Sequence, residues 1–224
     1  MGLEQLYEEI ISCEKCTRLR DWCISQEGTK KEYKDDSYWS LPLPGFGDPE
    51  ARVLITGLAP AAHGGNRTGR VFTGDTSGQY LFAALYRHGF SNQERSFSKD
   101  DSLELNDVFI TNVVKCAPPK NKPDASEFSA CSGFLEKEIQ AMENLEVILA
   151  FGGQAFERTK RVLRKMDADV SAAKFGHGVK FEFGAGFPVL MGSYHTSLYN
   201  INTRRITPEM LDDVFEKVKH VIDK

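Results

Sequence analysis

The chain has 224 residues, of which 41% are hydrophobic and 27% are charged, the composition of an ordinary folded protein with room for a sizeable core. We expect one domain over residues 1–224. The formal net charge of −4 argues against a protein that coats nucleic acid non-specifically, because such proteins carry a basic excess. No apolar run approaches the roughly 20 residues that span a bilayer, and no secretory signal opens the sequence, so a cytoplasmic location is expected.

The first half of the chain is expected to contain one strand between two helices. Apolar residues recur at helical spacing over residues 3–12 and predict a helix there. Residues 24–49 are polar and end in a run of prolines and glycines, which indicates a long surface loop. Residues 52–56 are typical of a buried strand, and a glycine-rich loop separates them from a helix predicted over residues 79–88.

The second half of the chain repeats this alternation of short apolar strands and amphipathic helices. Strands are expected at residues 108–111, 147–151 and 188–191, and helices at residues 124–142, 154–165 and 208–222. Such alternation predicts a mostly parallel, four-stranded sheet with helices on both faces. In sheets of this kind, the loops that leave the carboxyl ends of the strands carry the function.

Three loops at those carboxyl ends carry polar or glycine-rich motifs. They are residues 57–75 (GLAPAAHGGNRTGRVFTGD), residues 111–123 (TNVVKCAPPKNKP) and residues 194–200 (YHTSLYN). The first loop could cradle an anion at the start of a helix, although it matches neither a Walker A motif nor a dinucleotide fingerprint. A purely structural loop is the alternative.

Four of the five cysteines can be grouped into two pairs. Cys13 and Cys16 form a C-x-x-C pair, whereas 14 residues separate Cys116 from Cys131. Two thiolate pairs that folding brings together suit a zinc ion or an iron–sulfur cluster. The unequal spacing favours the cluster, because a zinc ribbon uses two tight hooks. Buried free thiols are the alternative, and Cys23 is left as the odd thiol.

Together, the three loop motifs and the four paired cysteines resemble the uracil-DNA glycosylase superfamily, and most of all its type b, or family 5, iron–sulfur branch. The resemblance implies a three-layer α/β/α sandwich and a 4Fe–4S cluster held by Cys13, Cys16, Cys116 and Cys131. It also implies an enzyme that hydrolytically removes uracil, and other deaminated bases such as hypoxanthine, from DNA. The expected partner is DNA, bound by a monomer associated with the nucleoid.

The resemblance assigns a base pocket to residues from all three loops. Phe72 would stack on a base that has left the double helix, and Asn112 would read the pyrimidine edge, since an amide offers both an acceptor and donors. His195 would donate a hydrogen bond to the departing base, helped by the backbone N–H groups of Leu58 and Ala59. A core phenylalanine, an asparagine that caps a strand and a structural histidine are the respective alternatives.

Two residues are candidates for holding the attacking water. Superfamily members with a GQDPYH motif use its aspartate for this purpose, and Ala59 stands at that place here, as in other type b sequences. Asp75 and Asn121 could replace the aspartate: a carboxylate can accept a proton from water, whereas an amide can only position it. A capping role at the helix that follows is the alternative for Asp75. Thr196 also departs from the superfamily pattern, which has proline there.

The remaining site residues concern DNA binding and the type of reaction. Ser197, Arg204 and Arg205 are expected to contact DNA phosphates. We expect a monofunctional enzyme, because no lysine stands out as a Schiff-base nucleophile, although Lys115 and Lys120 keep that question open. The alternatives from other classes are a non-catalytic iron–sulfur or zinc protein that binds nucleic acid, and a hydrolase that binds a nucleotide phosphate with the glycine-rich loop.

Overall fold

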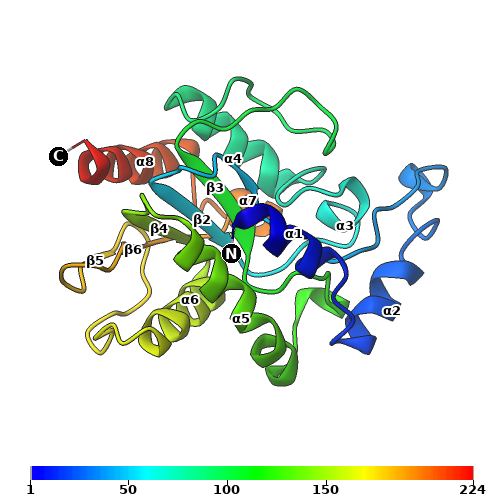
Figure 1. Cartoon of the computed structure of the whole chain (residues 1–224). Helices are drawn as coiled ribbons and strands as arrows, with labels where there is room; N and C mark the ends of the chain where they lie inside the picture. Colours follow the sequence, from blue (N-terminus) through cyan, green and yellow to red (C-terminus); the bar gives the residue numbers. More distant parts are fainter. Residues whose placement is uncertain (1, 224) are drawn as a thin grey trace.

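One sheet runs through the protein, whose computed structural model describes residues 2–223. Its six strands follow the order β1-β3-β2-β4-β6-β5, and the middle four are parallel (Figure 1). These four are β2 (Val53–Gly57), β3 (Val108–Asn112), β4 (Val147–Phe151) and β6 (Val189–Ser193). Each coincides with a predicted apolar run, so the predicted parallel sheet is confirmed.

The sheet is wider than the four strands that we predicted. β1 (Phe46–Gly47) pairs antiparallel with β3, and β5 (Lys180–Phe181) pairs antiparallel with β6. A strand of two residues shows no alternation of polar and apolar side chains, so it leaves no mark in the sequence and forms only by pairing with an existing edge. The predicted loop over residues 24–49 therefore contains β1, together with a short 3-10 turn, η1 (Lys31–Tyr33).

All five predicted helices are present. They are α1 (Leu3–Ile11), α4 (Thr76–Arg87), α5 (Ala125–Ala141), α6 (Gly153–Lys165) and α8 (Pro208–Ile222). Three further helices were not predicted, namely α2 (Thr17–Ser25), α3 (Gly65–Thr68) and α7 (Leu198–Asn202). α2 buries only Leu19 and Cys23, and the other two span about one turn each, so none of the three shows the apolar stripe that marks a helix in a sequence. No helix within residues 2–223 is both long and apolar enough to cross a membrane.

Helices cover both faces of the sheet, which confirms the three-layer sandwich. α1, α5 and α6 pack on one face, and α4 and α8 lie together on the other (Figure 1). Alternate strand residues serve two cores: Leu54 packs on the side of α5 and α6, whereas its neighbours Val53 and Ile55 pack on the side of α4 and α8. The central strands are buried on both faces, and this is why they read as continuous apolar runs.

Capping interactions anchor the loops at the carboxyl edge of the sheet. Asp75 caps α4 by accepting the N–H of Gly78 at 3.0 Å, and Ser197 caps α7 by accepting the N–H of Asn200 at 3.4 Å. These contacts satisfy N–H groups that the first turn of a helix leaves unpaired. The loops that follow β2 and β6 are thereby fixed where the strands end.

Candidate active site

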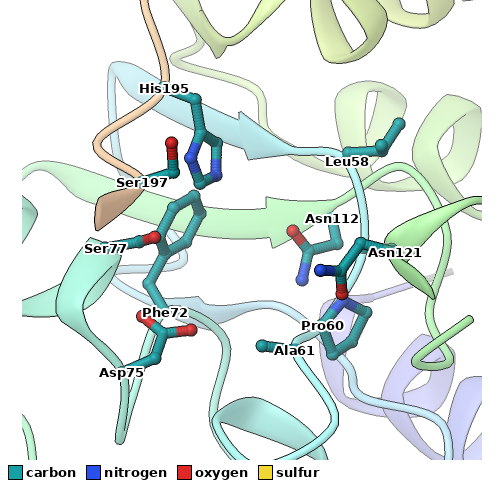
Figure 2. Close-up of a pocket in the computed structure, with 11 residues that line it drawn as sticks. Leu58, Pro60, Ala61, Phe72, Asp75, Ser77, Asn112, Asn121, His195 and Ser197 are labelled. Carbon is teal, nitrogen blue, oxygen red and sulfur yellow. The ribbon is translucent and has the colours of Figure 1, made fainter. Parts of the chain in front are cut away.

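A cavity of about 300 Å³ opens at the carboxyl edge of the sheet (Figure 2). Its walls are formed by Leu58, Ala59, Pro60, Ala61, Phe72, Asp75, Ser77, Asn112, Asn121, His195 and Ser197. They come from the last residue of β3, the first turn of α4 and the loops that follow β2, β3 and β6. The structure therefore brings together, in one cavity, every residue predicted to bind the base or to take part in the chemistry. Pro60, Ala61 and Ser77 complete the wall and carry no signal of their own in the sequence.

Phe72 and His195 form one side of the cavity (Figure 2). Their rings are stacked, with centroids 6.0 Å apart and planes inclined by 27°. Phe72 has a left-handed backbone, with φ of 53°, which is strained for an aromatic residue. Gly78 makes room for that turn, because a Cβ at this position would lie 1.6 Å from the carbonyl oxygen of Phe72. Phe72 also belongs to the core on the side of α4 and α8: its side chain is 8% exposed and its ring lies 6.0 Å from that of Phe151. It therefore lines the cavity and packs in the core at the same time.

Asn112 forms the opposite side, at the last residue of β3. Its side chain points into the cavity (Figure 2). The residue is 2% exposed, and its amide makes no hydrogen bond to any other side chain or backbone group in the described part of the chain. Gly57, its partner in the parallel register, lies directly behind it: a Cβ there would be 2.3 Å from Oδ1 of Asn112 and 2.8 Å from the Phe72 ring. Among the described residues, the buried side-chain atoms without a partner are Nε1 of Trp22 and Oδ1 of Asn66. The Asn112 amide instead faces the open cavity, where a polar ligand could bind it.

His195 is neutral at physiological pH. Burial lowers the pKa of its imidazole to about 4, because an apolar environment disfavours the charged form. Two hydrogen bonds fix the loop that carries it: the Thr196 hydroxyl donates to the carbonyl of Ser77 at 2.9 Å, and Asn200 donates to the carbonyl of His195 at 2.8 Å. Thr196, where the superfamily pattern has proline, thereby ties the last loop to the first.

Asp75 both caps a helix and lines the cavity. While its Oδ1 accepts the N–H of Gly78, its Oδ2 lies beside Gly64, where a Cβ would approach to 2.7 Å. Burial raises the pKa of the Asp75 carboxyl, although the N–H groups of Gly78 and Ser77 oppose the shift. The capping role considered from the sequence is therefore present, and it leaves the second carboxylate oxygen for another contact.

Asn121 lies on the far side of the cavity from Asp75, next to the side chain of Asn112 (Figure 2). It ends a short 3-10 turn, η2 (Pro119–Asn121). Asn121 and the preceding Lys120 both have left-handed backbones, with φ of 55° and 54°, and asparagine adopts this conformation more readily than most residues. The turn thereby aims the amide of Asn121 toward the cavity.

The three predicted phosphate contacts lie at different places. Ser197 lines the cavity. Arg205 lines a neighbouring cavity of about 280 Å³, which shares Leu58 and His195 with the first. Its guanidinium lies 4.8 Å from the ring centre of Tyr194. Arg204 is exposed and lines neither cavity.

Two exposed apolar residues beside this edge were missed in the sequence. Leu198 and Tyr199 are 56% and 72% exposed, and they directly follow Ser197 in α7. Large apolar side chains held in water at the rim of a cavity indicate a contact surface. The sequence alone could not distinguish them from core residues, because the exposure depends on where α7 packs.

Comparison with known proteins identifies the family. A sequence model of the uracil DNA glycosylase superfamily matches residues 44–219, which include every residue of the cavity wall. The chain belongs to the uracil DNA glycosylase superfamily. The type-5 uracil-DNA glycosylase of Thermus thermophilus is 41% identical over 221 residues, which cover 99% of both chains.

Two further relatives of the same type are equally similar. The type-5 uracil-DNA glycosylase of Mycobacterium leprae is 43% identical and covers 97% of this chain and 95% of its own. That of Pyrobaculum aerophilum is 44% identical and covers 96% of this chain and 91% of its own. All three are type-5 proteins, and this chain is a member of that branch of the uracil DNA glycosylase superfamily.

Neither lysine that was considered as a nucleophile lines the candidate cavity of this glycosylase-family chain. Lys115 is buried with Glu138, and its Nζ donates to both carboxylate oxygens at 2.8 and 2.7 Å and to the Thr111 hydroxyl at 2.6 Å. Lys120 is exposed. Among the described residues, the cavity wall contains no lysine.

The four paired cysteines gather at one place beside the sheet. Cys13 and Cys16 lie between α1 and α2, Cys116 follows β3, and Cys131 lies in α5. All four pack against the same core. Burial, with smaller contributions from the neighbouring Cys131, Glu127 and Cys13, raises the pKa of Cys16 to about 11. Cys23 is a buried neighbour of Cys116 and donates to the carbonyl of Ala117 at 3.5 Å.

The chemistry of the donor set suits a metal centre built on thiolates. Within residues 2–223, no three histidine, cysteine or carboxylate side chains are close enough to hold one metal ion. Four thiolates can bind either zinc or an iron–sulfur cluster. Four cysteines without histidine are also the usual ligands of a 4Fe–4S cluster.

Proposed function

We propose that this chain is a monofunctional uracil-DNA glycosylase, which hydrolyses the bond between uracil and deoxyribose in DNA and leaves an abasic site. The main observation in support is that one cavity is lined together by the amide of Asn112, the Phe72 ring and the neutral imidazole of His195. Its volume of about 300 Å³ is in the range that holds a small ligand. No cavity feature favours the non-catalytic alternative.

The two sides of the cavity would bind a flipped base by different forces. Phe72 supplies a stacking surface, and stacking of a base on an aromatic ring contributes roughly 1–3 kcal/mol. Asn112 supplies an acceptor for N3–H and a donor for O4 of uracil, whereas cytosine presents the reverse pattern. Hypoxanthine and other deaminated bases that offer a similar N–H and carbonyl pair would also be accepted.

Bond cleavage leaves a negative charge on the base and a positive charge on the sugar. His195 would donate one ring N–H to the departing base, and the backbone N–H groups of Leu58 and Ala59 would add to this stabilisation. Asp75 and Asn121 would hold the attacking water near the sugar. The absence of a lysine among the described residues of the cavity wall favours water over a covalent amine intermediate.

The residues around the cavity mouth would hold the DNA. Ser197, Arg204 and Arg205 would contact phosphates of the damaged strand. Leu198 and Tyr199, which are exposed on α7, would fill the space in the base stack that the flipped nucleotide leaves. A single domain that acts as a monomer on intracellular DNA is part of this proposal.

The function is tested with a labelled duplex that contains one uracil. We expect the wild-type protein to produce an alkali-labile abasic site and to release free uracil without cutting the strand itself. Asn112→Ala should lower single-turnover uracil excision by about 1–3 kcal/mol of transition-state binding, the usual cost of losing such polar contacts. Hypoxanthine excision should fall less, because a purine uses these contacts differently.

Two results would contradict this assignment. If the strands stayed intact after the wild-type reaction was treated with alkali, no abasic site would have formed and the proposed glycosylase activity would be wrong. Equal losses on uracil and hypoxanthine in Asn112→Ala would show that Asn112 does not read the base. Asn200→Ala is the matched control, since Asn200 holds the backbone of the His195 loop and lies outside the wall of the base cavity; both bases should then be affected alike.

We propose further that Cys13, Cys16, Cys116 and Cys131 hold a 4Fe–4S cluster. When bound, the cluster would supply iron–thiolate bonds that connect the α1–α2 segment to the β3 loop and α5, regions far apart in the sequence. Cys116 and Cys131 are buried and Cys13 and Cys16 are partly buried. Burial, with a smaller effect of neighbouring thiols, raises the pKa of Cys16 and Cys131, so that their ionised forms need positive iron nearby. The cluster has a structural role in this proposal.

Iron content tests the cluster independently of activity. Protein purified without oxygen should be brown, absorb broadly in the visible range and contain about four irons per chain. Cys116→Ala should lose iron and melt at a lower temperature, whereas Cys23→Ala, which changes the buried neighbour of Cys116, should keep its iron. Stoichiometric zinc without iron in wild-type protein would contradict the cluster.

A further inference from the structure

Helix α6 carries positive charge that the candidate active site does not use. Its 13 residues include five lysines or arginines and one glutamate, in a chain whose formal net charge is −4. Its two lysines are neutralised by glutamates at 2.8 and 2.9 Å. Arg158, Arg161 and Arg164 have no carboxylate within ion-pair distance anywhere in residues 2–223.

Arg158 is held in place although no anion neutralises it. Its guanidinium lies 3.7 Å from the ring centre of Phe128 on α5, and this cation–π contact fixes the position of the charged group. Burial lowers the pKa of Arg158, and the positive charge of nearby Arg161 lowers it further. Arg158 is half-buried and Arg161 is exposed, and two neighbouring guanidinium groups that repel one another are stabilised when an anion binds to both.

The two arginines face a groove of about 140 Å³ between α5 and α6, helices that lie side by side on one face of the sheet (Figure 1). Ser129 and Ser132 of α5 also line the groove, and serine hydroxyls commonly contact phosphate oxygens. Val113, another lining residue, directly follows Asn112 of the base cavity. The groove and the base cavity share no lining residue, and the chain passes from one to the other between Asn112 and Val113.

We propose that this groove binds phosphates of the DNA backbone that flanks the lesion; the identity of this polyanion rests on the proposed function. The planar guanidinium matches the oxygens of a phosphate and can bind two of them at once. α6 begins at Gly153, directly after β4 and thus at the carboxyl edge of the sheet, and Arg161 lies about 12 Å along it at 1.5 Å per residue. The groove would therefore contact phosphates that flank the flipped nucleotide rather than the phosphates of that nucleotide itself.

The salt dependence of binding to undamaged duplex DNA tests this site. The variants are Arg158→Gln, Arg161→Gln and the double substitution. Arg164→Gln is the matched control, since it removes the same charge from the same helix outside the groove. The slope of log K against log salt should fall by about 1 in each single variant and by about 2 in the double variant. The control should keep the wild-type slope, and all variants should melt like the wild type.

Duplex length and a small phosphate distinguish the possible ligands. The double variant should bind long undamaged duplexes about tenfold or more weakly at low salt, and should bind short undamaged duplexes, which lack the flanking phosphates, as well as the wild type does. Unchanged slopes in the double variant would overturn the proposal. So would saturable binding of inorganic phosphate at the groove that long DNA does not displace. Binding of undamaged DNA does not require catalysis, so a failure of the proposed groove can be distinguished from a failure of uracil excision.

Discussion

Replacing His195 by alanine is expected to lower single-turnover uracil excision by about 10²–10³-fold, the usual effect of removing one donor that stabilises a developing anion. The imidazole lines the cavity and stacks on Phe72, and burial lowers its pKa to about 4. The ring is therefore neutral at pH 7 and carries one N–H. A neutral donor stabilises the departing base without giving up its proton, so the rate should not follow the ordinary titration of histidine near pH 6.5.

His195→Gln is the matched variant, because glutamine keeps an N–H donor and should recover part of the lost rate. The lowered pKa also predicts an effect on stability. Unfolded histidine titrates near pH 6.5, whereas His195 in the folded chain titrates near 4, so only the unfolded chain takes up this proton between those values. The wild-type melting temperature should therefore drop more steeply than that of His195→Gln as the pH falls from 6.5 toward 4. This role would be contradicted if the melting temperatures of the wild type and His195→Gln fell in parallel with pH. It would also be contradicted if His195→Ala excised uracil at the wild-type rate.

The main strands and helices could be predicted because burial leaves a pattern in the sequence. β2, β3, β4 and β6 are apolar on both faces, and α5 and α8 each bury one stripe. The edge strands β1 and β5 have two residues each, and their existence depends on the strand they pair with. The same limit applies to α3 and α7, which are too short to show helical periodicity.

The sequence could predict which residues form the candidate site better than it could predict which charged groups are buried or unpaired. Parallel strands deliver their following loops to one edge, and this rule already places Phe72, Asn112 and His195 together. Burial is a tertiary property, so the sequence could not show that Lys115 is enclosed with Glu138. For the same reason it could not show that Arg158 lacks a counter-ion beside Phe128.

A second large effect is expected at Asp75. Its carboxylate has two separable contacts, since Oδ1 accepts the N–H of Gly78 as the cap of α4 and Oδ2 lies beside Gly64 at the cavity. Burial raises the pKa of this carboxyl, which makes the ionised form a stronger base toward water. If Asp75 accepts the proton of the attacking water, its removal should lower excision by about 10²–10⁴-fold.

Asparagine and alanine at this position separate the two contacts. Asn is as good an N-cap as Asp, whereas Ala loses the cap and costs about 1 kcal/mol of stability. We therefore expect Asp75→Asn to melt near the wild-type temperature and Asp75→Ala to melt lower, with both losing excision rate to a similar extent. Both should bind abasic DNA normally. A variant that loses activity in proportion to stability would indicate that Asp75 only caps the helix.

The pH dependence of the rate distinguishes a base from a residue that only positions water. The wild-type rate should fall on the acid side as Asp75 is protonated, at a pH above the ordinary range of aspartate because its pKa is raised. This fall should vanish in Asp75→Asn. Asn121→Ala should instead lower the rate by about 10–100-fold at every pH and keep the acid fall, since an amide positions water without taking its proton. Wild-type rates in both alanine variants would mean that stabilisation of the departing base by His195 and the loop N–H groups is sufficient, with water entering unaided.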